Sequence, residues 1–405
     1  MKFRNPQFAL LWLGQIFCQL AERFLIFILV LLIYERTQSN AGVAYVGITF
    51  GIPAILLGAF AGVLVDIWDH KWTLFFVNFF RAVVMTFLFL LYPFHHSLSV
   101  LLIFAFATAI LQQLFIPAET ATIPQIVSSR SLVTANAIFI STFYAIGIIG
   151  MGLGSFLDPF FSSRHAYFGL IAAFFAISAL FLFLMPYKAQ HVQFQTRKNL
   201  LVELWEGFQF AFLEYRIRQL MIATLIISTV FSSLTILGIG FADKVLKIGA
   251  ENFGYLAVIG GLGMFVGIVM LNFLKNKLSL FRLINIGFIG GGLSLLFFAG
   301  SPYFLSDVKV VVVFTALMVA GFFLAWIVIP IQTGLQQLTT HSFRGRVLGI
   351  QNMLLNFSLT LPVWWLGKLA DQYGIQEIFL GLSVVVLLQG LIMIKQIPHL
   401  EKTVS

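Results

Sequence analysis

The segment LGQIFCQLAERFLIFIL, from Leu13 to Leu29, decides the fold class of this chain. It is apolar enough to cross a bilayer as a helix, yet it carries Glu22 and Arg23 side by side near its middle. Ionisable side chains are costly at that depth and almost always face the interior of a helical bundle. The segment therefore predicts a multi-helix membrane protein in which neighbouring helices surround these two charges.

The composition of the whole chain supports the same class. Of 405 residues, 60% are hydrophobic and only 10% are charged, and the mean hydropathy is +1.00. Soluble domains carry about 25% charged residues, and a soluble protein of this length has too much exterior to hide so many apolar side chains. The chain is therefore predicted to be an all-α polytopic membrane protein, with most of its 47 Phe residues facing lipid.

Twelve segments are long and apolar enough to span a hydrocarbon core of about 30 Å. They lie at about 8–34, 42–66, 74–93, 98–123, 134–157, 165–186, 217–240, 252–274, 280–300, 308–338, 345–369 and 375–396. The polar stretch 187–216 places Leu201, Leu204, Trp205 and Phe208 at helical spacing, which indicates an amphipathic surface helix. We expect a six-helix bundle over 1–186, a cytoplasmic linker over 187–216 and a second six-helix bundle over 217–405.

The distribution of basic residues predicts the orientation in the membrane. With both termini on one side, 16 of the 24 Lys and Arg residues fall in the loops of that side and 6 fall on the other, while Arg23 and Arg81 lie within helices. Cytoplasmic loops carry the excess of Lys and Arg. Both termini are therefore expected in the cytoplasm, with the protein in the cell membrane.

Several classes of function are not expected. The net charge of +9 is scattered over short loops without a basic face, so we expect no nucleic-acid partner. The single cysteine, Cys18, excludes an internal disulfide or a multi-cysteine metal site and is expected to be a small packing residue. The chain has no G-x-x-x-x-G-K-[ST], H-E-x-x-H or G-x-S-x-G motif. We therefore expect neither an enzyme nor a cofactor or metal.

The two halves of the chain show weak internal similarity. The fourth predicted helix ends in PAETATIPQ from Pro117, and the tenth contains PIQTGLQQL from Pro330. Aligning the two prolines matches Thr120 with Thr333 and sets Glu119 opposite Gln332. Such symmetry is typical of transporters built from two related helical bundles around a central path.

The turn after the second predicted helix carries the first family resemblance. GVLVDIWDHKWTL, from Gly62 to Leu74, resembles the loop signature of the major facilitator superfamily, with Ile67, Asp69 and His70 departing from it. The resemblance implies the major facilitator fold, twelve transmembrane helices in two bundles. It also implies a gating role for Gly62, Asp66 and Lys71 as the bundles slide.

A narrower resemblance extends over most of the chain. FRNPQFALLWLGQIFCQLAERF, PAETATIPQIVSSRSLVTANAI and RGRVLGIQN are similar to the macrolide-efflux-like branch of the drug:proton antiporters, and related lysophospholipid transporters share the layout. The resemblance implies a secondary active transporter that exports an amphipathic or hydrophobic small molecule in exchange for protons, by alternating access and as a monomer among membrane lipids. A lysophospholipid or other lipid transporter is the first alternative. A non-transporting membrane scaffold or sensor is the second.

The first helix carries the main candidates for proton coupling or substrate binding. Gln15, Gln19 and Glu22 are spaced i, i+4 and i+7, so they form one polar stripe that should face the bundle interior. Glu22 is expected either to titrate during transport or to be permanently paired with a base of a neighbouring helix. Arg23 is a further candidate and lies about 100° around the helix from Glu22.

The fourth helix adds Glu119 and Gln112, which lie in line with Thr108. Glu119 is expected either to take part in proton coupling or to pair with Arg81 or with an arginine of the second half. Further polar residues could line the path or join helices: Asn136, Gln332, Gln336, Asn352 and Asn356. Glycine pairs four residues apart, such as 150/154 and 263/267, predict close helix contacts.

Overall fold

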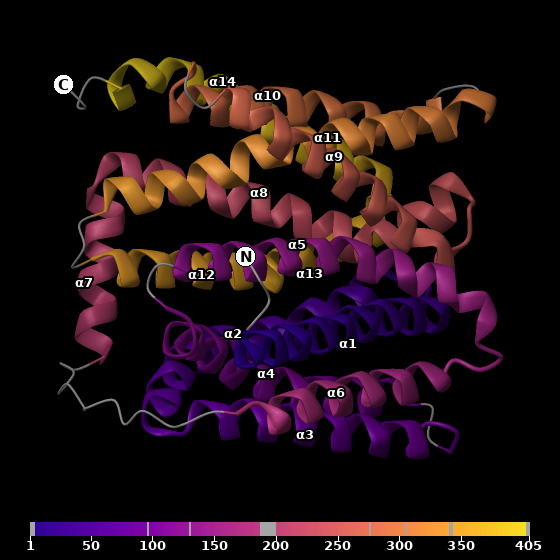
Figure 1. Ribbon diagram of the computed structural model, residues 1–405. Helices are drawn as coiled ribbons and strands as arrows, with labels where there is room; N and C mark the ends of the chain where they lie inside the picture. Colours follow the sequence, from indigo (N-terminus) through magenta and orange to yellow (C-terminus); the bar gives the residue numbers. More distant parts are fainter. Residues whose placement is uncertain are drawn as a thin grey trace. The chain divides into compact units, whose positions relative to one another are not determined.

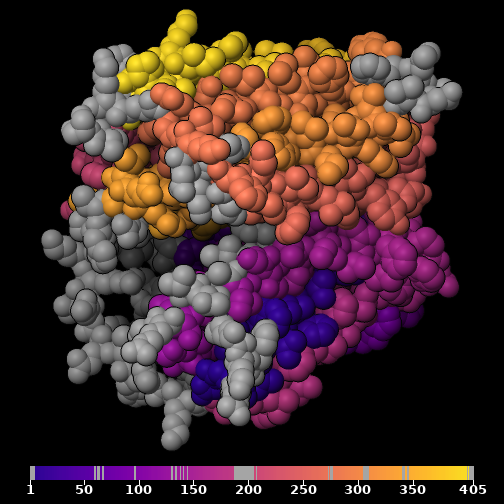
Figure 2. Space-filling view, turned by 45° about the horizontal axis from the view of Figure 1, so that its top comes forward, coloured from indigo at the N-terminus to yellow at the C-terminus, as the bar shows by residue number. Residues whose placement is uncertain are grey.

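The computed structural model describes residues 5–94, 97–128, 131–186, 200–274, 277–303, 306–339 and 343–401; the residues of uncertain placement are grey in Figure 2. The regular elements of the described ranges are all helical (Figure 1). Twelve helical segments in these ranges are long and apolar enough to cross a membrane. The predicted fold class, an all-α polytopic membrane protein with twelve spanning helices, is therefore confirmed.

The chain separates into two compact units. The first contains Met1–Arg36 and Tyr45–Gln195, and the second contains Thr37–Ala44 and Thr196–Ser405. Thr37–Ala44, which comprises the end of α1 (Pro6–Thr37), Gln38 and Ser39, and the start of α2 (Asn40–Ile67), therefore belongs to the second unit. Each unit is described below by itself.

The first unit is built from the six N-terminal helices, apart from residues 37–44 at the junction of α1 and α2. Their bounds are α1 Pro6–Thr37, α2 Asn40–Ile67, α3 His70–Leu91, α4 Leu98–Ile126, α5 Leu132–Leu157 and α6 Ala166–Leu184, with a short 3-10 turn Asp158–Phe160 after α5. Helices α3 and α6 lie side by side (Figure 1). Asp69 caps α3, because its side chain accepts a hydrogen bond from the backbone N–H of Trp72 at 3.1 Å.

The second unit contains eight α-helices in the described ranges. They are α7 Leu200–Leu213, α8 Tyr215–Gly240, α9 Phe253–Leu274, α10 Leu280–Ala299, α11 Ser306–Leu338, α12 Arg344–Ser358, α13 Leu361–Tyr373 and α14 Ile375–Glu401. Short segments flank them: a π-helix Phe241–Leu246 and 3-10 turns Ala250–Asn252 and Ser301–Tyr303. Helix α7 is the helix expected between the bundles, and its Trp205 is 65% exposed.

One predicted span differs from the structure. The eleventh segment, expected as one helix over 345–369, is divided into α12 and α13. Thr360, between them, has φ −103° and ψ −109°, which is not helical. Pro362 provides the physical reason, because proline lacks the N–H that a continuous helix needs and clashes with the carbonyl four residues earlier. Hydropathy alone does not register such a break.

Glycines bring helices into close contact, as their spacing predicted. A Cβ on Gly263 of α9 would lie 1.8 Å from the carbonyl oxygen of Met318 in α11, and one on Gly267 would lie 2.3 Å from that of Phe322. Trp326 Nε1 donates to the Gly267 carbonyl at 3.1 Å. The α9–α11 contact therefore depends on the absence of side chains at these two positions.

Glycines also allow close contact between α1 and α5 in the first unit. A Cβ on Gly150 would lie 2.6 Å from Cβ of Arg23, and one on Gly154 would lie 2.5 Å from the ring of Phe27. The small residues of α5 thus allow α1 to approach closely on the side where Arg23 lies.

Candidate functional site

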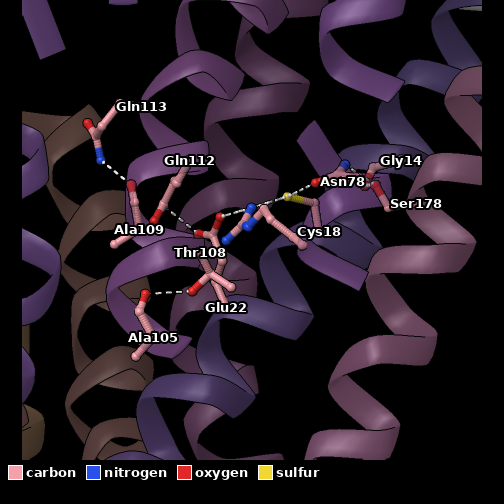
Figure 3. A network of polar contacts seen from close by, with 11 residues as sticks. Gly14, Cys18, Glu22, Asn78, Ala105, Thr108, Ala109, Gln112, Gln113 and Ser178 are labelled. Atoms are coloured by element: carbon pink, nitrogen blue, oxygen red, sulfur yellow. Dashed lines mark hydrogen bonds and ion pairs between the residues drawn. The ribbon is translucent and has the colours of Figure 1, made fainter. Parts of the chain in front are cut away.

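Glu22 lies at a junction of three helices of the first unit. Its Oε1 pairs with Nη1 of Arg81 from α3 at 3.0 Å, and its Oε2 accepts from Nε2 of Gln112 in α4 at 2.8 Å. Glu22 is 7% exposed and Arg81 is fully buried. Figure 3 shows Gln112 directed toward the Glu22 carboxylate. In this structure Glu22 is paired with a base of a neighbouring helix, the kind of partner expected in one of its two predicted roles.

The ion pair continues into a chain of polar contacts (Figure 3). Arg81 Nη1 donates to Sγ of Cys18 at 3.3 Å, and this thiol lies 3.4 Å from Oδ1 of Asn78. Asn78 Nδ2 then donates to Oγ of Ser178 at 2.7 Å, and Ser178 donates to the Gly14 carbonyl at 2.6 Å. Cys18 is buried, as expected, but it also links these groups. The network joins α1 to α3 and α6.

Arg81, one of the partners expected for Glu119 if that acid forms an ion pair, lies beside Glu22. Its guanidinium also lies over the ring of Phe175, with Cζ 4.1 Å from the centroid. Such cation–π contacts contribute more when the cation is desolvated. Arg81 is therefore held from two sides, by a carboxylate and by an aromatic face.

Four other candidates carry buried polar atoms that have no partner among the described residues. They are Oε1 of Gln15, Oε1 of Gln19, Oε1 of Glu119 and Nε of Arg23. Gln15 and Gln19 are 3% and 5% exposed, so bulk water does not supply the missing hydrogen bonds. Each unpartnered buried polar group of a native protein requires an explanation, such as a ligand, a water or a catalytic role.

Arg23 lies on the side of α1 that meets α5. Its Cζ is 5.6 Å from the ring centroid of Phe143. A Cβ on Gly147 would lie 3.9 Å from the same atom, in ordinary van der Waals contact. Arg23 is thus bounded by an aromatic ring and by glycine backbone, while its neighbour Glu22 is bound to Arg81.

Of the three residues expected to have a gating role, Gly62, Asp66 and Lys71, the structure describes the side chain of Lys71. Helix α2 extends to Ile67, so Gly62 and Asp66 belong to its last turns, and the side chain of Asp66 lies outside the described residues. Lys71 in the first turn of α3 places Nζ 5.3 Å from the Trp72 ring and 5.9 Å from that of Phe183. The apolar groove between α3 and α6, of about 520 Å³, contains none of the candidate residues.

The remaining polar candidates do not join the Glu22 network. Asn136, Gln332, Gln336 and Asn352 are exposed within their helices. Asn356 donates to the carbonyl of Asn352 at 2.8 Å, within α12. Asn136, in the same unit as Glu22 and Glu119, forms no hydrogen bond with either acid among the described residues.

A second polar site, at the end of α13, was not predicted. The carboxylate of Asp371 accepts four hydrogen bonds: from Ser39 Oγ at 2.6 Å, from the backbone N–H groups of Asn40 at 2.7 Å and Ala41 at 3.0 Å, and from Asn40 Nδ2 at 2.9 Å. Asp371 therefore caps the N-terminus of α2 from a distant helix. Ser39 and Asn40 are typical capping residues, but no local pattern points to Asp371.

Twelve apolar spans and charged groups buried between them define a multi-pass membrane protein with a polar site inside its helices. Residues 11–361 match the model of the Major Facilitator Superfamily. The chain belongs to this superfamily and is a membrane transporter.

Two relatives from Bacillus subtilis (strain 168) agree with this assignment. The chain is 25% identical over 382 residues to the uncharacterized MFS-type transporter YfiS, covering 90% of this chain and 87% of the relative. It is 20% identical over 295 residues to the uncharacterized MFS-type transporter YfmI, covering 71% and 70%.

Solved structures share the fold. The nucleoside transporter NupG matches with a TM-score of 0.77 and 16% identity, over 96% of this chain and 99% of that one. The peptide transporter POT in complex with sulfate matches with a TM-score of 0.78 and 11% identity, over 99% and 96%. At these identities the likeness demonstrates the fold alone.

Proposed function

We propose that this protein is a proton-coupled exporter of an amphipathic or hydrophobic small molecule, in the manner of the macrolide-efflux-like drug:proton antiporters. Its two bundles alternate access to the two sides of the cell membrane. The proposal of proton coupling rests on one observation: Glu119 is a carboxyl in α4 whose Oε1 is buried without a hydrogen-bond partner among the described residues.

Glu119 and Glu22 are suited to different tasks. Glu22 accepts from Arg81 and Gln112, so removing its charge would leave a buried cation uncompensated. Glu119 has no such bonds to break within the described part of the chain, so it can gain or lose a proton without disrupting an ion pair. We therefore assign the exchangeable proton to Glu119 and the positioning of α1, α3 and α4 to Glu22.

The test is transport in proteoliposomes with an imposed pH gradient, using a panel of amphipathic drugs and dyes. Wild type should move at least one compound against its gradient, and an uncoupler should abolish that movement. Glu119→Gln should lose proton-driven transport by tenfold or more while retaining exchange of labelled for unlabelled substrate. Glu214→Gln is the matched control, because Glu214 is an exposed acid at the start of α8.

Three results would overturn the proposal. Full proton-driven transport by Glu119→Gln would remove the assignment of the proton to Glu119. Transport of a lysophospholipid that continues unchanged with an uncoupler would instead favour a lipid transporter without proton antiport. No movement of any compound in vesicles would leave only the non-transporting alternative.

A further inference from the structure

An apolar groove lies between α3 and α6, which run side by side in the first unit (Figure 1). Its volume is about 520 Å³, within the range of about 300–1,000 Å³ that is typical of ligand sites. Ala82 of α3 and Ala179 of α6 line it with small, buried side chains, and larger, exposed side chains line it at Phe79, Phe87 and Leu180. The two alanines therefore form the floor of the groove, and the larger side chains form its walls.

The groove suits a long molecule without polar groups. Thr86 is the only polar side chain among the described residues that line it, and its hydroxyl donates to the carbonyl of Ala82 at 2.8 Å. The lining residues of α3 extend from Phe75 to Leu90, which is about 22 Å at 1.5 Å per residue. This length exceeds half of a hydrocarbon core of about 30 Å. A hydrocarbon chain that begins at the membrane surface can therefore lie in the groove.

One end of the groove is marked by aromatic rings and a lysine. Phe75 of α3 and Phe183 of α6 meet there, with ring centroids 5.5 Å apart. Trp72 packs against both rings and is 42% exposed, as is typical of tryptophans at the membrane–water interface. Nζ of Lys71 lies 5.9 Å from the Phe183 ring, and Lys71 forms no ion pair with a described residue. This end therefore offers a cation at the level where lipid phosphates lie.

These features favour a lipid over a second copy of the chain as the occupant. Apolar helix faces gain little by associating in lipid, and helices associate there through small residues or interhelical hydrogen bonds at the contact. The exposed rings of Phe87 and Phe183 hold another helix away from the alanine floor, and the Thr86 hydroxyl is bonded within its own helix. A flexible acyl chain can reach the floor between the rings and fill the space with dispersion contacts.

We propose that the groove binds one acyl chain of an anionic phospholipid and that Lys71 binds the phosphate of the same lipid. The acyl chain determines where the lipid lies, because the groove contacts hydrocarbon alone. Lys71 determines the headgroup preference, because a zwitterionic lipid carries its own cation beside the phosphate and is attracted less. The site does not involve Glu22 or Glu119, so it is independent of the proposed proton coupling.

The test maps photoreactive lipids on the full-length protein in nanodiscs of phosphatidylcholine. A small fraction of the lipid is phosphatidylglycerol that carries a diazirine in its acyl chain. After irradiation and digestion, adducts should concentrate on the residues of α3 and α6 that line the groove. Phosphatidylcholine with the same diazirine chain should label these residues about fivefold less, the effect expected for one lysine near an anionic lipid.

Variants separate the role of the acyl chain from that of the charge. Ala176→Trp adds a ring at an exposed position of the groove, so it should remove most groove adducts of both lipids. Ala173→Trp adds the same ring at an exposed position of α6 outside the groove and should leave the adducts unchanged. Lys71→Gln should equalise labelling by the two lipids, and Lys71→Arg should retain the preference. Lys368→Gln removes a lysine that also lies over a tryptophan, 3.8 Å from the Trp364 ring centroid, and should change nothing at the groove.

Four outcomes would overturn the proposal. Adducts spread evenly over the exposed faces of the spanning helices would show ordinary surrounding lipid. Equal labelling of the groove by the two lipids in wild type, or an unchanged preference in Lys71→Gln, would remove the role of Lys71. A dimer that excludes both lipids from the groove and that Ala176→Trp disrupts would identify a second copy as the occupant. The melting temperatures of the variants should match that of wild type, because none of the substituted side chains is buried.

Discussion

Nη1 of Arg81 lies 3.0 Å from Oε1 of Glu22, and the arginine side chain is completely buried. This pair joins α1 to α3 within the first unit, and Gln112 adds α4 to the same carboxylate. A buried pair of this kind is tolerated because the two charges compensate each other. Substitutions at Glu22 should therefore act first on stability and only through stability on transport.

Glu22→Gln should destabilise the protein by about 3–5 kcal/mol, because Arg81 would remain as a buried cation without its carboxylate. Thermal unfolding of the purified protein measures this loss. The double variant Glu22→Gln/Arg81→Met should recover much of it, since both charges are then absent. A melting temperature of Glu22→Gln equal to that of wild type would show that the pair contributes little.

Asp66→Asn should lower the maximal transport rate while leaving substrate affinity nearly unchanged. The turn between α2 and α3 resembles a family loop that controls the movement of the two bundles. A change in this turn should therefore alter the rate of that movement and leave the contacts with substrate unchanged. Initial rates over a range of substrate concentrations separate the two parameters. A loss confined to affinity would contradict the gating role of this turn.

Gly263→Ala should destabilise the second unit by about 1–3 kcal/mol, because the new methyl group would lie 1.8 Å from the Met318 carbonyl oxygen and force α9 away from α11. Gly381→Ala is the matched control. A Cβ there meets nothing within 4 Å, so the better helix propensity of alanine should leave stability unchanged or raise it by up to about 1 kcal/mol. Equal melting temperatures of the two variants would refute the close α9–α11 contact.

Asp371→Ala should cost about 1 kcal/mol, the usual effect of losing a helix cap, because the N-terminus of α2 would lose the acceptor of four hydrogen bonds. Gln372→Ala, at the next exposed position, should have no effect. Unfolding curves of the two variants provide the comparison. Faster hydrogen exchange at the backbone amides of Asn40 and Ala41 in Asp371→Ala would locate the loss at this cap.

Single cysteines should report the orientation. Gln209→Cys lies on the exposed side of α7, and Tyr303→Cys replaces a side chain that is 81% exposed between α10 and α11. Cys18 can remain, because it is buried and linked to Arg81. The excess of basic residues predicts that a membrane-impermeant maleimide added to intact cells labels Tyr303→Cys and not Gln209→Cys. The opposite result would invert the topology.

The sequence by itself determined the properties that depend on short segments. Twelve apolar runs predicted twelve spans, and spaced leucines and aromatic residues predicted α7, because hydropathy and helical periodicity are local. The glycine pair at Gly263 and Gly267 predicted a close helix contact for the same reason. The break at Thr360 also has a local cause, Pro362, but the prediction of one helix over 345–369 missed it because hydropathy does not register a proline.

Only the tertiary structure decided which polar groups are paired. Glu22 could face a base from several helices, and only the rotation and depth of α3 place Arg81 beside it. Oε1 of Glu119 and Nε of Arg23 are left without a hydrogen-bond partner among the described residues. Asp371 reaches Asn40 across 331 residues of sequence. Such pairs depend on how distant helices are turned and shifted against each other, because a polar side chain in a bundle is stabilised by whichever complementary group packing brings within about 3 Å.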